Sequence, residues 1–312
     1  MPRARRIMVL VDRRSRGGGA LRRAVQLART GSAELHLCLV EPAAGARSAL
    51  QRNVLVLARS AQRQEGHDWL LDLADEVKML AGPVHTHLVL DQPLHLRLLE
   101  RIDTLRPDLL VMSLHYQPQL KRSLLTPLAW TLLRQAPCDL LLAGRALGDA
   151  LARVIAVVDT AHVDAHHSEL NRHTLALARS LADQSGAELH LVQAGAQVVA
   201  PDSLPALAAE ARHLHELQKR RFAQFAEENQ VPSRLRHLLA GDPATALSRF
   251  ASKPASDLVM LGVSGEPGEQ PLPEYLIGQL RCDVWVVRAP ASMTARPAAP
   301  AIQPPDELMS LN

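Results

Sequence analysis

Two glycines in the second half of the chain have the spacing of a phosphate-binding loop. Gly262 and Gly265 form a G-x-x-G sequence after the apolar run 257–261. Glycines let the backbone come close to a phosphate group, whose oxygens accept hydrogen bonds from free amide N–H groups. Prolines and glycines crowd residues 266–273, and the apolar run 282–288 follows. The stretch predicts a buried strand, a loop that opens at Gly262, a short helix and a second buried strand.

Residues 12–23, DRRSRGGGALRR, place glycines and arginines before a helical pattern. Amides at a helix N-terminus could bind an anion there. No hydroxyl residue follows the glycines, and isolated glycine motifs are weak signals. An exposed, flexible turn is the interpretation that we favour.

Residues 162–173 hold four histidines and an aspartate. His162 and His166 would share one face of a helix, a spacing that suits zinc. Ser168 is expected to be the N-cap of the next helix, which predicts that the histidines before it lie in a loop. Such clusters are only suggestive, and no metal site is predicted.

The sequence carries no recognisable nucleophile. It has no G-x-S-x-G elbow, and Cys138 and Cys282 begin apolar runs without an evident base beside them. Without a recognisable nucleophile, we expect that the protein is not an enzyme. The three cysteines form no C-x-x-C pair and the sequence has no signal-peptide pattern, which favours a reducing compartment, so we expect a cytoplasmic protein. No apolar run approaches the ~20 residues of a membrane span.

Length and composition indicate two globular domains. The chain has 312 residues, of which 47% are hydrophobic and 21% charged. The formal net charge of +3 is too small to indicate nucleic-acid binding. Arginines gather in the first 25 residues, and we interpret them as a solvated, solubilising face.

Four sequence stretches occur twice in the same order, which indicates an internal duplication. AELHL occurs twice, and three further stretches have similar counterparts in the second half. The pairs are residues 33–37 and 187–191, 108–113 and 257–262, 138–144 and 282–288, and the runs that end at Asp12 and Asp159.

Each copy alternates short apolar runs with helical patterns. Helices are predicted at 18–31, 94–105 and 127–135 of the first copy and near 203–229 of the second. The apolar runs do not alternate with polar residues, which is typical of strands covered on both faces. The predicted class is α/β, with two tandem, doubly wound, five-stranded parallel-sheet domains and ligands expected at the carboxyl ends of the strands.

The predicted domains span residues 1–146 and 147–290. The remaining residues, 291–312, are rich in proline and alanine and are predicted to be a disordered tail.

The five-stranded unit, the aspartate that ends its first strand and the glycine loop after its fourth strand resemble the universal stress protein family, whose fold is of the adenine-nucleotide alpha-hydrolase type. Two such units resemble its tandem members. Further stretches look most like the E type of that family: residues 21–25, 124–138, 241–247 and 280–283. The resemblance implies a stress-response protein with an internal pseudo-dimer that forms through the two final strands. A further homodimer is left open.

The nucleotide-binding branch of that family carries G-x2-G-x9-G-[S/T] after its fourth strand. In the first copy the corresponding residues are Ser113, Tyr116, Thr126 and Pro127, so every glycine is lost. Pro127 has no N–H to donate. Thr126 before Pro127 is instead a good helix start.

The second copy keeps the first half of this motif. Gly262 and Gly265 are present, but Gln270 and Pro271 stand at the last two positions. Only four residues separate Gly265 from Gln270, where the motif has nine. We interpret this loop as the remnant of a nucleotide site.

Asp12 and Asp159 stand where the family's nucleotide binders place an acid that contacts the base. The alternative is that each aspartate caps the turn that follows it, and both interpretations stay open. A residual nucleotide site would consist of Asp12, Asp159, Gly262 and Gly265.

The predicted function is therefore a stress-response regulatory or binding protein with degenerate nucleotide loops. No cofactor is expected, apart from ATP at low affinity in the second domain, and protein partners are unknown. One alternative is an ATP-binding, slowly hydrolysing switch that works through the second domain. Another is a carrier of an apolar ligand in the domain crevice.

Overall fold

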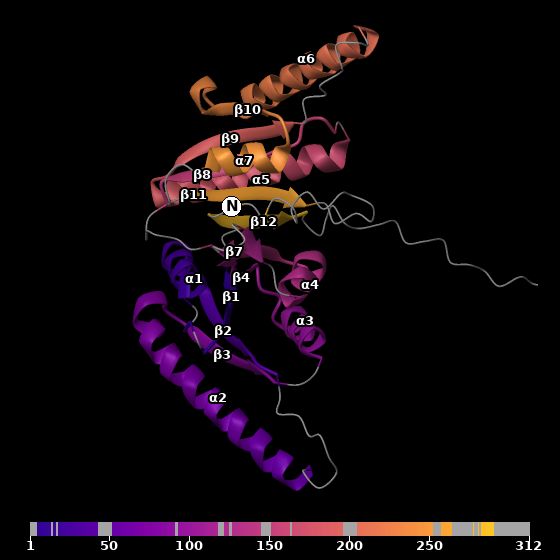
Figure 1. The fold of residues 1–312 in the computed structure, drawn as a ribbon. Coiled ribbons are helices and arrows are strands. Elements are labelled where there is room, and N and C mark those ends of the chain that lie inside the picture. The colour runs from indigo at the N-terminus through magenta and orange to yellow at the C-terminus, as the bar shows by residue number, and fades with distance from the viewer. Residues whose placement is uncertain are drawn as a thin grey trace, which may run out of the picture.

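A computed structural model shows two α/β units in succession, which we call the first copy and the second copy (Figure 1). The structure describes residues 5–13, 15–16, 18–42, 52–90, 93–117, 122–124, 127–144, 151–162, 164–195, 205–251, 257–263, 277, 280 and 282–289.

The first copy has five parallel strands. They are β1 (Arg6–Val11), β2 (Glu34–Val40), β3 (Val84–Val89), β4 (Leu109–Ser113) and β7 (Asp139–Ala143). Its helices are α1 (Gly18–Gly31), α2 (Arg52–Ala81), α3 (Leu94–Leu105) and α4 (Pro127–Gln135). A small antiparallel hairpin of β5 (His115–Gln117) and β6 (Arg122–Leu124) lies between β4 and α4 in the sequence.

The second copy repeats this order. Its strands are β8 (Arg153–Val157), β9 (Glu188–Gly195), β10 (Arg236–Ala240), β11 (Asp257–Val263) and β12 (Asp283–Arg288). Its helices are α5 (Ala165–Ser185), α6 (Pro205–Glu228) and α7 (Pro243–Ala251), with the 3-10 turn η3 (Ser233–Leu235) before β10.

The two copies share one sheet, in the order β10-β9-β8-β11-β12-β7-β4-β1-β2-β3. Neighbouring strands are parallel within each copy, whereas β12 and β7 are antiparallel and join the copies through the pairs Val284–Leu142, Trp285–Leu141 and Val286–Leu140. This junction lies at the middle of the molecule in Figure 1. An antiparallel junction of equivalent strands fits an internal pseudo-dimer.

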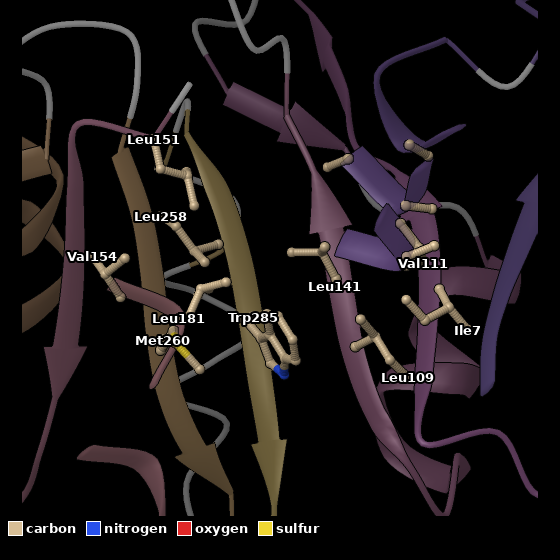
Figure 2. Close-up of a cluster of buried hydrophobic side chains, with 14 of the residues drawn as sticks. Ile7, Leu109, Val111, Leu141, Leu151, Val154, Leu181, Leu258, Met260 and Trp285 are labelled. Carbon is tan, nitrogen blue, oxygen red and sulfur yellow. The ribbon is translucent and has the colours of Figure 1, made fainter. Parts of the chain in front are cut away.

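The sheet is covered on both faces, as its continuously apolar strands predict. Side chains of β1 alternate, so that Ile7 and Val9 point to one core and Met8 to the other. The first core is closed by α1, α2, α5 and α6, and the second by α3, α4 and α7. The first core runs across the junction, from Ile7 past Trp285 to Val154 (Figure 2).

The α/β class and the doubly wound topology are confirmed. Helices α1, α3 and α4 begin and end at the predicted residues, and α6 lies within the predicted range. The hairpin β5–β6 was not predicted.

Two local predictions are wrong. Helix α5 begins four residues earlier than expected from Ser168, because the Asp164 side chain accepts a hydrogen bond from the His167 amide and caps the helix there. His166 is consequently helical. Gly262 lies inside β11, paired with Val287 of β12, and does not open a loop.

Within the described part of the chain, none of the helices combines the length and the apolar character that a membrane crossing requires. The predicted boundary at 146/147 and the predicted tail lie in segments outside the described residues, and both stay predictions.

Candidate functional site

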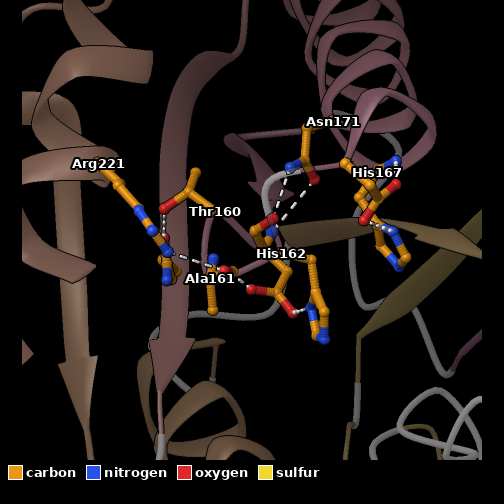
Figure 3. A network of polar contacts seen from close by, with 9 residues as sticks. Thr160, Ala161, His162, His167, Asn171 and Arg221 are labelled. Atoms are coloured by element: carbon orange, nitrogen blue, oxygen red, sulfur yellow. Dashed lines mark hydrogen bonds and ion pairs between the residues drawn. The ribbon is translucent and has the colours of Figure 1, made fainter. Parts of the chain in front are cut away.

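The carboxyl end of β8 carries a hydrogen-bonded turn that includes Asp159. Figure 3 shows the next residues of this turn, Thr160 and Ala161. The Asn171 side chain on α5 holds the Asp159 backbone from both sides, since its Oδ1 accepts from the Asp159 amide (3.1 Å) and its Nδ2 donates to the Asp159 carbonyl (2.7 Å). The Asp159 carboxylate accepts from the Ala161 amide and lies 2.8 Å from His162 Nδ1. Asp159 therefore makes the contacts that are expected if it caps the turn that follows it, which is one of its two interpretations.

Two further contacts fix this turn. Thr160 Oγ1 donates to Gln193 Oε1 of β9 over 2.6 Å, and both residues are buried. Arg221 of α6 donates to the Ala161 carbonyl (3.0 Å). Hydrogen bonds from α5, β9 and α6 together hold the turn (Figure 3).

Gly262 packs closely against α5. A Cβ atom at this position would lie 2.7 Å from Leu170 Cγ and 2.9 Å from Thr174 Oγ1. The contact between β11 and α5 therefore requires a glycine at position 262. Gly265, Gln270 and Pro271 lie outside the described residues, so the loop itself is not described.

The corresponding region of the first copy is described in part. Asp12 accepts a hydrogen bond from the Ser15 amide (2.8 Å), again as a turn cap. After Ser113 the chain enters the β5–β6 hairpin, in which Tyr116 pairs with Ser123. Helix α4 then begins at Pro127. Thr126, the predicted N-cap, is outside the described residues.

A cavity of about 350 Å³ lies between the copies, beside the antiparallel junction. Leu27 and Thr30 of α1 line it on one side and Leu177 and Leu181 of α5 on the other, with Asp139 and Trp285 from the junction strands. Ile7, Leu109 and Asp139 lie at the amino ends of their strands. The cavity is thus at the end of the first copy's sheet opposite to the predicted crevice.

Two aspartates connect the copies across the junction. Asp283 accepts from Arg23 Nε (2.6 Å) and from the Gly144 amide (2.9 Å), and burial raises its pKa although Arg23 opposes the shift. Asp139 accepts from Trp285 Nε1 (3.0 Å) and the Arg288 amide (2.9 Å), and burial raises its pKa also. The sequence analysis missed both sets of contacts.

Histidine pairs occupy corresponding places at the two edges of the sheet. His36 Nδ1 lies 3.0 Å from His87 Nε2 in the first copy, and His190 Nδ1 lies 2.9 Å from His237 Nε2 in the second. Burial lowers the pKa of His36, and it lowers that of His87 to about 4. Burial lowers the pKa of His237 too. These pairs were also missed, although the repeated AELHL sequence contains one member of each.

The histidines that the sequence singled out gather beside the turn. His162 and His167 are stacked, with ring centroids 4.8 Å apart. Each ring Nδ1 lies near a carboxylate, of Asp159 and Asp164 respectively. Hydrogen bonds from His167 lower the pKa of Asp164 to about 2.

The fold defines a tandem α/β protein whose two doubly wound copies share one sheet. Comparison with known proteins identifies the family. The sequence profile of the Universal stress protein family matches residues 3–144 and 153–288. The chain therefore belongs to this family and contains two of its domains.

A curated relative is the Universal stress protein E of Photorhabdus laumondii subsp. laumondii, which is 22% identical over 299 residues; the match covers 81% of this chain and 94% of that protein. A functionally unknown protein from Pseudomonas aeruginosa PAO1 has a similar solved structure, with a TM-score of 0.69, 22% identity and coverage of 93% and 95% of the two chains. A universal stress protein from Archaeoglobus fulgidus DSM 4304 has a TM-score of 0.62 at 12% identity, over 92% of this chain and 100% of that one. These structures support the fold. Family membership supports a role in the stress response.

Proposed function

We propose that the protein is a cytoplasmic stress-response regulator that acts by binding, without catalysis and with degenerate nucleotide loops. The observation that carries the proposal is the backbone of the first copy after β4. Tyr116, at the position of a motif glycine, pairs with Ser123 in the β5–β6 hairpin, and α4 starts at Pro127, which has no N–H to donate to a phosphate.

The expected loss of affinity is large. A hydrogen bond to a charged phosphate contributes about 1.5–3 kcal/mol. Loss of two or three such donors weakens binding by roughly two to five orders of magnitude, at about 1.4 kcal/mol for each factor of ten. A micromolar ATP site would become millimolar or weaker.

Titration calorimetry of the full chain with Mg-ATP tests this proposal. We expect a dissociation constant in the millimolar range or no measurable heat. A dissociation constant in the low micromolar range, or nucleotide extracted from freshly purified protein, would contradict it.

The second candidate is an ATP-binding, slowly hydrolysing switch in the second domain. It is favoured by the hydrogen-bonded turn at Asp159 and by the retained Gly265, whereas Gly262 is already required by its contact with α5. Gly265→Val is the informative variant, because a side chain at Gly262 would also displace α5. If weak ATP binding is present and survives in Gly265→Val, the site lies elsewhere.

The third candidate is a carrier of an apolar ligand, with the binding site in the cavity between the copies and not in the predicted domain crevice. The cavity between the copies favours it, since leucines of α1 and α5 line a space of about 350 Å³, the size of a small-ligand pocket. Mass spectrometry of organic extracts from the purified protein tests it. A bound compound that is absent from extracts of Leu177→Trp would place that compound in the cavity.

A further inference from the structure

Three potential metal ligands converge at the β2–β3 edge of the first copy. His36 of β2 and His85 of β3 are register partners, and their rings stack with centroids 4.8 Å apart. Glu34 precedes His36 by two residues, which places both side chains on the same face of β2. One ligand atom from each of Glu34, His36 and His85 lies within 4.8 Å of the other two.

The His36 imidazole is oriented for coordination. The residue is 7% exposed, and its Nδ1 lies 3.0 Å from His87 Nε2. Its Nε2 is buried and has no hydrogen-bond partner, and the nearest carboxylate oxygen, Oε2 of Glu34, is 3.8 Å away. A buried nitrogen without a partner is unusual, and a missing ion is one physical reason for it.

We propose that Glu34, His36 Nε2 and His85 bind a zinc ion. Two imidazoles and one carboxylate are a ligand set that zinc accepts, and a fourth position stays open to water. In this arrangement Nδ1 of His36 carries the proton and donates a hydrogen bond to Nε2 of His87, which fixes the tautomer that leaves Nε2 of His36 free. His87 is a positioning residue and does not touch the ion.

Coordination requires a modest rearrangement. Zinc bonds of ~2.0–2.2 Å bring tetrahedral ligands to about 3.4 Å from one another. Glu34 and His85 are both exposed, so their side chains can turn toward the buried nitrogen of His36. The two exposed ligands also give the ion a path from solvent.

The second copy is an internal control for this site. Glu188, His190 and His237 correspond to Glu34, His36 and His87, and the His190–His237 contact is retained. Leu235 stands where the first copy has His85.

In the first copy Arg6 Nε lies 4.0 Å from Glu34 Oε2, and the contacts of Glu188 in the second copy are shorter. Arg234 donates to Glu188 Oε1 (2.8 Å), and Glu188 Oε2 lies 3.1 Å from His190 Nε2. The corresponding strand pairs therefore carry a zinc site in the first copy, at β2–β3, and a hydrogen-bonded arginine, glutamate and histidine in the second, at β9–β10.

Titration of the chelator-treated full chain with Zn²⁺ tests the proposal. We expect one equivalent to bind with micromolar or tighter affinity, and Co²⁺ to give the visible absorption bands of a four-coordinate site. His85→Leu, which introduces the residue of the second copy, and Glu34→Gln should each weaken binding by about 100-fold or more. His87→Gln should weaken it by about 10–100-fold, the usual effect of an outer-shell partner.

Two control variants complete the experiment. Glu188→Gln should bind zinc like the unmodified chain, and so should the His162→Ala/His167→Ala double variant. Since Glu34 and His85 are exposed, their variants should stay folded, which circular dichroism checks. The proposal is overturned if the unmodified chain binds no zinc below millimolar concentration, if His85→Leu binds it unchanged, or if only the double variant loses it.

Discussion

The final strand of each copy begins with an aspartate that follows a cysteine, but the two aspartates make different contacts. Asp283 of β12 forms a buried ion pair with Arg23 of the first copy. Asp139 of β7 accepts hydrogen bonds from Trp285 and the Arg288 amide of the second copy. Both aspartates thus bind the opposite copy, once through a charged side-chain donor and once through neutral donors.

The difference between the two sides accounts for the cavity. When the two AELHL stretches are aligned, Arg23 corresponds to Leu177, and the buried Ala24 and Ala28 correspond to Ala178 and Ala182. On the Asp283 side the arginine reaches the carboxylate. On the Asp139 side Leu177 is shorter and lines the cavity. The two halves of this duplicated interface therefore differ, with an arginine on the carboxylate of one and a leucine beside a cavity in the other.

Separating the copies should have the largest effect on this interface. Fragments 1–146 and 147–290 would each expose an apolar final strand with unpaired backbone groups. We expect the separate fragments to self-associate or aggregate, and to form a stable heterodimer when they are mixed. Size-exclusion chromatography with light scattering measures this. Fragments that stay monomeric, soluble and stable would contradict the internal pseudo-dimer. Light scattering of the intact chain would show whether a further homodimer forms.

Arg23→Leu places the residue of the second copy in the first. It leaves Asp283 buried without its cationic partner, which should lower the free energy of unfolding by about 3–5 kcal/mol. Chemical denaturation measures the change. The matched control is Arg22→Leu, because Arg22 is exposed and should change stability little.

The decrease in the free energy of unfolding of Arg23→Leu should depend on pH. Burial already raises the pKa of Asp283 in the folded protein, and removal of Arg23 should raise it further. A carboxyl whose pKa is higher in the folded state binds more protons there than in the unfolded chain, so the variant regains stability as pH falls toward the unfolded value of about 3.9. A loss that stays constant across this range would show that Asp283 is not the cause.

The neutral side of the interface should be less sensitive. Trp285→Phe keeps most of the ring but removes the Nε1–H that donates to Asp139, and a buried acceptor left without this donor costs about 1–3 kcal/mol. Trp69→Phe on α2 is the control. A loss as large as that of Arg23→Leu would contradict the distinction between the charged and the neutral side.

Gly262→Ala compares the carboxyl ends of β11 and β4, which are corresponding strands of the two copies. Ser113 is its counterpart in the first copy, where α1 carries Ala20 at the position of Thr174. A methyl group at Gly262 would displace Leu170 or Thr174, at a cost of about 1–3 kcal/mol. Leu170→Ala in the same chain should recover part of the loss, whereas Ser113→Ala should change thermal stability little. An unchanged melting temperature in Gly262→Ala would show that α5 yields without strain.

The smallest effect is expected from removal of residues 290–312. This segment is rich in proline and alanine, and its sequence has almost no periodic apolar pattern. The truncated chain should melt within about two degrees of the full one. A larger drop would indicate that the end of the chain contributes to the folded core.

The sequence by itself determined the duplication, the α/β class and several helix boundaries, because these depend on local patterns. Pro127 begins α4 and Gly18 begins α1 as predicted, and the apolar runs marked strands of the main sheet. The earlier start of α5 also had a local signal, the aspartate at position 164 three residues before His167. The loop that contains Gly265 stays a prediction.

Only the tertiary structure decided which distant residues meet. Arg23 and Asp283 are 260 positions apart, and neither has a local pattern that names the other. His36 and His85 become neighbours because β2 and β3 pair in one register, which strand sequences do not specify on their own. Gly262 has the spacing of a phosphate loop, yet it lies against Leu170 and Thr174 because α5 crosses β11 there. Local propensity sets the helices and strands, whereas the register and packing between them decide which distant side chains meet.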